Sequence, residues 1–170
     1  MQKETALSDF DVARDEFLSA LSAAPDEALT FLRPGDIYAI GGLAVHCNWV
    51  LKHYKRVLQQ LAQSDGAEFR AVDPEGEHDA ADQRALAGLE AAERGPELAE
   101  LATLHEGVKQ ATVQMPAAAW ETKTAVFYGG DEDAFPTSPD DVLGWLRDHY
   151  REHVPHAGEL LADWRAAQAQ

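Results

Sequence analysis

Three of the seven histidines lie within eight residues near the C-terminal end of the chain, at His149, His153 and His156. The four-residue spacing of His149 and His153 puts both imidazoles on one face of a helix, with their Cβ atoms about 6 Å apart. At that distance both side chains can reach a single divalent cation. Structural zinc usually takes four protein ligands, and catalytic zinc takes three and a water. A metal site therefore needs a further ligand from elsewhere in the chain.

The C-terminal helix that carries these histidines has an inward-facing apolar stripe. Helical periodicity places six residues on it: Leu146, Tyr150, His153, Ala157, Leu160 and Trp164. His149 lies within about 60° of its centre. A single inward histidine is usually a hydrogen-bonded core residue, but two favour a shared metal because protonating both in a low-dielectric interior is costly. His156 lies nearer the edge, and we expect it to support a metal ligand rather than to bind metal.

The third ligand has several candidates. His46 and His53 lie seven residues apart in a predicted second helix, on nearly the same azimuth at the border of its apolar stripe. Spacing alone does not choose between them, and a carboxylate or a water could also complete the site. His105 lies inside the apolar stripe of a third helical region, where we expect a core histidine. His78 lies in an acidic loop, where we expect it to be solvated.

Length and composition restrict the class of protein. A chain of 170 residues, 45% hydrophobic and 26% charged, fits one domain spanning residues 1–170. No apolar stretch approaches the roughly 20 residues of a membrane span. A formal charge of −16 opposes binding to nucleic acid or anionic lipid. The single cysteine, Cys47, rules out a cysteine-based zinc cluster, and with no targeting segment at the N-terminus we expect a cytoplasmic protein.

Hydrophobic periodicity predicts an all-α fold, a four-helix bundle with one long crossover. A loop at 64–78 holds a short extended piece at 68–72. An aromatic-bearing crossover at 116–138 matches neither a clean helix nor a hairpin. In the third helical region, Gly95-Pro96 interrupts the pattern and leaves open one kinked helix or two. The predicted helical regions are 8–24, 36–63, 79–115 and 138–167.

Two segments carry a resemblance to a known family. The run Ile40–His46 and the run Trp145–His156 resemble the DinB/YfiT-like superfamily of metalloenzymes, whose layout the whole chain follows. The resemblance implies a four-helix bundle with a non-standard helix order. It also implies a divalent metal, zinc or nickel, held by three histidines with an open position. Carried onto this sequence, the ligands are His46, His149 and His153.

The resemblance also implies a function. Members of this superfamily include transferases that use low-molecular-weight thiols such as bacillithiol or mycothiol, and mycothiol-dependent maleylpyruvate isomerases form a related branch. We therefore expect a thiol-dependent S-transferase that acts on small electrophiles and forms a homodimer. The alternatives are a metal-dependent hydrolase of the same fold and a non-catalytic, stress-associated metal-binding bundle. A fourth protein ligand, such as His105, would favour the non-catalytic alternative.

Overall fold

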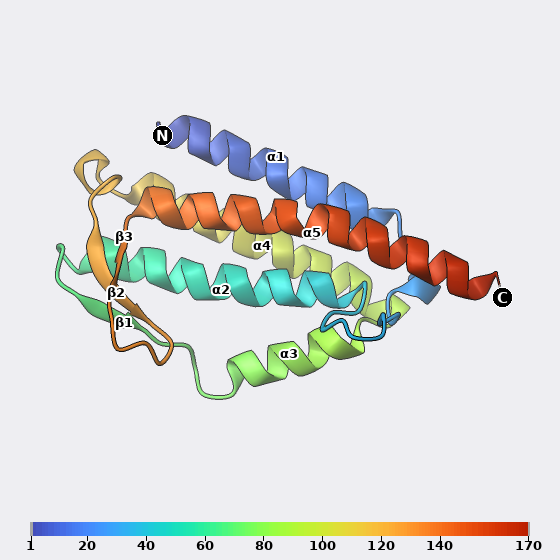
Figure 1. Ribbon diagram of the computed structural model, residues 1–170. Helices are drawn as coiled ribbons and strands as arrows, with labels where there is room; N and C mark the ends of the chain where they lie inside the picture. The colour runs from blue at the N-terminus through green and yellow to red at the C-terminus, as the bar shows by residue number, and fades with distance from the viewer. Residues whose placement is uncertain (1, 170) are drawn as a thin grey trace.

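The computed structural model describes residues 2–169 and confirms a mainly helical bundle (Figure 1). Its four long helices are α1 (Lys3–Ser22), α2 (Gly42–Gln63), α4 (Ala91–Gln114) and α5 (Pro139–Gln168). Helix α1 packs along α5, and α2 packs along both α4 and α5. A shorter helix, α3 (Glu77–Ala87), packs against α2, and two 3-10 turns occupy Asp26–Ala28 and Ala117–Ala119. Within residues 2–169, every helix is too short or too polar to cross a membrane.

The bundle core follows the predicted stripes. On α1, Phe10, Ala13, Phe17 and Leu21 are buried at steps of three and four residues. Helix α1 starts at Lys3, five residues before the predicted start. Helix α5 begins as predicted, because the Ser138 hydroxyl accepts the backbone N–H of Asp141 and Pro139 occupies the first turn. The apolar stripe of α5, which carries the histidines, faces α1 and α2.

The start of α2 differs from the prediction of residue 36. Residues 36–41 are not helical, because the backbone N–H groups of 39–41 donate to carbonyls at 85, 31 and 29 instead. The helix begins at Gly42, where an added Cβ would lie 1.7 Å from the carbonyl oxygen of Ala85. Close packing of α2 on the end of α3 therefore requires this glycine.

The third helical region is two helices, but the break is not at Gly95-Pro96. It lies at Gly88, which has a φ of +80° and where a Cβ would meet the carbonyl oxygen of Leu29 at 2.3 Å. Only glycine fits both conditions. Pro96 lies inside α4, in its exposed second turn, where water can reach the carbonyl that loses its helical partner.

A small three-stranded sheet lies at one end of the bundle (Figure 1). Strand β1 (Phe69–Ala71) is the predicted extended piece, and it pairs in parallel with β2 (Thr124–Tyr128). Strand β2 pairs in the antiparallel sense with β3 (Phe135–Thr137). The expectation that the crossover holds no hairpin was therefore wrong. The sheet places Ala71 and Tyr128 beside α2 and α5, where both line a pocket.

Candidate metal centre

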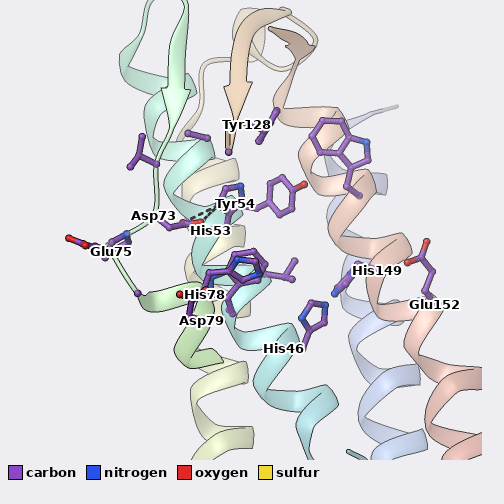
Figure 2. A pocket seen from close by; sticks show the side chains of 18 of the residues that line it. His46, His53, Tyr54, Asp73, Glu75, His78, Asp79, Tyr128, His149 and Glu152 are labelled. Carbon is purple, nitrogen blue, oxygen red and sulfur yellow. Dashed lines mark hydrogen bonds and ion pairs between the residues drawn. The ribbon is translucent and has the colours of Figure 1, made fainter. Parts of the chain in front are cut away.

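Three histidines from two helices meet on the inner side of the bundle. His46 comes from the first turns of α2, and His149 and His153 come from successive turns of α5. Each offers a ring nitrogen, and these nitrogens all lie within 4.8 Å of one another. The ring centroids of His149 and His153 are 4.6 Å apart, and that of His46 lies 4.9 Å from His149. Figure 2 shows His46 and His149 facing each other across the gap between the helices.

The protonation states of the three rings suit metal binding. Burial lowers the pKa of His46 and His149 to about 4. Burial, together with the neighbouring imidazoles, lowers the pKa of His153 to about 3. All three rings are therefore neutral at pH 7, and each keeps a lone pair on one nitrogen.

Two ring nitrogens of this cluster are buried without a partner. Nε2 of His149 and Nε2 of His153 have no hydrogen bond within residues 2–169, although both atoms are shielded from solvent. Leaving a buried polar atom unpaired costs about 1–3 kcal/mol, so such atoms usually have a ligand. A divalent cation satisfies both nitrogens at once. The residues present therefore fit a metal ion.

A hydrogen-bonded chain runs from His153 away from the cluster. Nδ1 of His156 lies 3.4 Å from Nδ1 of His153, and Nε2 of His156 lies 3.0 Å from a carboxylate oxygen of Asp36. The carboxylate accepts from Nε2 of His156, so Nδ1 of His156 accepts from Nδ1–H of His153. This tautomer leaves the lone pair of His153 on Nε2, the unpartnered atom. His156 thus lies between His153 and Asp36, and its supporting role stays a prediction.

Asp36 anchors this chain in the loop before α2. Its side chain is only 8% exposed. Burial by itself would raise the pKa of Asp36, but hydrogen bonds from His156, from two backbone N–H groups and from Arg33 lower it to about 2. The carboxylate is thus charged throughout the neutral range and holds the proton on Nε2 of His156.

Tyr38 covers the cluster from the same loop. Its ring stacks on His46 at a centroid distance of 4.4 Å, and its hydroxyl lies 3.3 Å from Nε2 of His46. Burial raises the pKa of Tyr38, so the phenol keeps its proton in the neutral range. Tyr38 therefore fixes the orientation of the His46 ring.

A pocket of about 950 Å³ opens beside the cluster, with His46 and His149 in its wall. That volume is at the upper end of the range for small-molecule sites. Four aromatic side chains line it: Trp49, Tyr54, Tyr128 and Trp145. A small molecule in this pocket would meet the two histidines directly.

The alternative third ligands have other partners. Nδ1 of His53 lies 2.8 Å from a carboxylate oxygen of Asp73, and the same carboxylate accepts from Arg56. His53 lines the pocket but is not a member of the three-histidine cluster. The structure therefore brings His46, and not His53, to the pair on α5.

His105 and His78 also lie apart from the cluster. His105 is fully buried, as expected, and its Nε2 lies 2.8 Å from Asp11 on α1. The ring of His78 stacks on Trp49 at 4.3 Å and lines the pocket, although the side chain is 56% exposed. The expectation of a solvated His78 was therefore incomplete, because it overlooked the aromatic partner.

Sequence reasoning missed several residues of the site. Asp36 was placed in a helix, and Tyr38, Trp49 and Asp73 were given no role. Asp36 and Tyr38 carried a signal, because they lie within ten residues of His46 in a segment that opens with Pro34-Gly35. Asp73 carried none, since its contact with His53 depends on the return of the chain after α2.

Fold and site together define a class of protein: a helical bundle in which three neutral histidines converge beside a small-molecule pocket. The chain belongs to the DinB superfamily, whose family model matches residues 9–157. This confirms the resemblance carried by the two histidine-bearing segments.

Two solved structures have a similar fold. One is a mycothiol-dependent maleylpyruvate isomerase, with a TM-score of 0.67, 12% identity and 93% of this chain covered. The other is a histidine-to-alanine mutant of a mycothiol-dependent maleylpyruvate isomerase, with a TM-score of 0.70, 10% identity and the same coverage. The match spans 61% of each of those chains, so this chain is similar to only part of them. No curated protein matches this sequence.

Proposed function

We propose that this chain is a divalent-metal-dependent enzyme that transfers a low-molecular-weight thiol to a small electrophile, with His46, His149 and His153 as the metal ligands. One observation carries the proposal: three neutral histidines converge beside a pocket of about 950 Å³, and two of them have unpartnered, buried Nε2 atoms. Zinc and nickel both suit an all-imidazole ligand set. The fold shared with mycothiol-dependent isomerases supports a thiol as the co-substrate.

An open coordination position separates a catalytic from a purely structural metal site. Within residues 2–169, the cluster contains three histidines and no fourth histidine, cysteine or carboxylate. His105, which the sequence offered as a fourth ligand, is hydrogen-bonded to Asp11 instead. The arrangement therefore favours the catalytic hypothesis over the non-catalytic bundle.

When bound at such a site, a divalent cation lowers the pKa of a thiol or water ligand and so supplies a nucleophile at neutral pH. The chain itself provides a proton acceptor. The Asp73 carboxylate accepts from Nδ1–H of His53, which leaves the lone pair on Nε2. Nε2 of His53 can then take the thiol proton in the pocket.

In the proposed thiol transfer, each bond, electron pair and proton is accounted for. A bond forms from sulfur to the electrophilic carbon while the bond from that carbon to its leaving group breaks. The leaving group departs with the electron pair, and the thiol proton ends on Nε2 of His53. Trp49 and Trp145 line the pocket and give it a partly apolar wall.

A thiol screen on metal-loaded protein tests the proposed function. The purified protein is loaded with zinc or nickel and incubated with monobromobimane and either mycothiol, bacillithiol, glutathione or no thiol. We expect one thiol to give conjugate at least ~100-fold faster than the uncatalysed reaction, within the range that positioning and acid–base catalysis supply. Consumption of the electrophile without thiol would favour the hydrolase. No acceleration with any thiol or electrophile would contradict the proposed transferase.

Changing His156 to alanine is expected to weaken metal binding without abolishing it. The residue fixes the tautomer of His153 through Nδ1, and losing such a supporting partner typically costs ~10–100-fold in metal affinity. Asp36→Asn should have an effect of the same sign, because it removes the charge that holds His156. Competition with a chelator of known affinity measures both. Wild-type metal affinity in both variants would show that His156 and Asp36 do not support the metal site.

A further inference from the structure

The pocket beside the three histidines has a wall of aromatic rings. Tyr54, Tyr128 and Trp145 contact one another, with ring centroids 5.8–6.4 Å apart. Trp49 lines the pocket as well and stacks on His78. Such rings offer a large apolar contact area, and their faces attract cations more than anions.

The charged side chains around this pocket are all acidic. Among the lining residues that the structure describes, neither a lysine nor an arginine occurs. Figure 2 shows carboxylates on two sides, with Glu75 and Asp79 at the start of α3 and Glu152 on α5 across the opening. Five carboxylates line the pocket: Asp73, Glu75, Asp79, Asp148 and Glu152.

Two of these carboxylates are neutralised by partners outside the pocket. Asp73 is paired with Arg56, and Asp148 is paired with Arg147. The other three, Glu75, Asp79 and Glu152, are exposed. Within residues 2–169 they form no ion pair with a lysine, an arginine or a histidine. The opening therefore carries three uncompensated negative charges.

The inner end of the pocket holds His46 and His149 of the proposed metal site, and a bound metal ion would place its positive charge there. A reactant that spans the pocket thus meets a metal-binding end and an acidic end. Carboxylates close to a low-dielectric wall concentrate cations and repel anions.

We infer that the electrophilic substrate carries a cationic group, an ammonium or a guanidinium, on an apolar or aromatic body. The apolar body lies against Tyr54, Tyr128 and Trp145, and the cation lies at the opening near Glu75 and Glu152. Anionic molecules of the same size bind more weakly. This inference rests on the proposed function, which places the reaction at the three histidines. The charge preference is a property of the pocket and can be measured by binding alone.

Three probes that share a benzyl group test the charge preference. They are benzyltrimethylammonium, neutral benzyl methyl sulfone and phenylmethanesulfonate, whose sulfonate is a weak metal ligand. Binding to the zinc-loaded protein is followed by tryptophan fluorescence and calorimetry. We expect the cation to bind at least ~10-fold more tightly than the anion, with the neutral probe between them, and salt to reduce the difference. Equal binding of all three, or tighter binding of the anion, would overturn the inference.

A matched pair of triple variants assigns the preference to the pocket. The pocket variant is Glu75→Gln/Asp79→Asn/Glu152→Gln. The control variant, Glu4→Gln/Glu27→Gln/Glu68→Gln, changes the net charge by the same amount at exposed positions outside the pocket. The pocket variant should lose most of the preference, and the control should keep it. Equal losses in both would show that the preference comes only from the net charge of the protein.

Metal content and thiol transfer are measured on the same preparations. A cation preference without thiol transfer would contradict the proposed function alone. Thiol transfer without a cation preference would contradict the substrate class alone. The two failures are thereby distinguished.

Discussion

Alanine at both His149 and His153 is expected to lower the bound divalent metal from about one ion per chain to about zero. The double change leaves His46 as the sole ring of the cluster, and one imidazole does not hold zinc against competing water. Elemental analysis of protein purified from metal-supplemented medium measures the result. His46→Ala should also lose metal, since it removes one of the three proposed ligands.

The matched control is a histidine of the same helix as His46. His53→Ala should keep wild-type metal content, because His53 is bonded to Asp73 outside the cluster. Loss of metal in this variant with retention in His46→Ala would move the third ligand to His53. Full metal retention in the His149→Ala/His153→Ala variant would contradict the site on α5.

Changing His53 to glutamine is expected to slow thiol transfer by ~100-fold or more, with metal content unchanged, because a positioned proton acceptor contributes about 10²–10⁴-fold. Glutamine keeps polar atoms near Asp73 but cannot take the thiol proton. Asp73→Asn should slow transfer less, since it disturbs the tautomer and leaves the imidazole in place. Initial rates on metal-loaded protein with the active thiol measure both changes.

A matched control separates a proton acceptor from a general effect of changing the pocket. His78→Gln, which changes another histidine of the pocket, should keep the wild-type rate. An unchanged rate in His53→Gln would remove His53 from the mechanism.

The convergence of the candidate histidines could be predicted in part because two of them lie on one helix. Positions 149 and 153 share a face whatever the rest of the fold does, and the apolar residues around them indicate that this face is buried. The third member of the cluster depends on how α2 packs against α5. Periodicity left His46 and His53 equivalent, and the family resemblance favoured His46, the residue that the structure brings to the cluster.

The supporting residues could not be predicted, since their contacts link distant segments. Asp36 reaches His156 across 120 residues, and Asp73 reaches His53 only after the chain has turned back past α2. No local pattern encodes such pairs. The pocket wall could not be predicted for the same reason, because Tyr54 and Trp145 come from different helices and Tyr128 comes from the sheet.

The differences in secondary structure have local causes. Gly95-Pro96 has residue types that often interrupt a helix. The break lies at Gly88 instead, because its positive φ and its close neighbour end α3 there. The sheet was missed because its strands have three to five residues and one contains Pro136. Strands this short show too little alternation to be recognised, and the parallel pairing of β1 with β2 joins segments far apart in sequence.

The most direct test of the metal site is a crystal structure of the zinc- or nickel-loaded protein, with anomalous scattering recorded at the metal edge. We expect one anomalous peak, within bonding distance of ring nitrogens of His46, His149 and His153, with a non-protein ligand facing the pocket. A peak at Asp11, His105 and Glu106, which also bring ligand atoms within 4.8 Å of one another, would contradict the assignment. So would a fourth protein ligand that closes the coordination sphere around the three histidines.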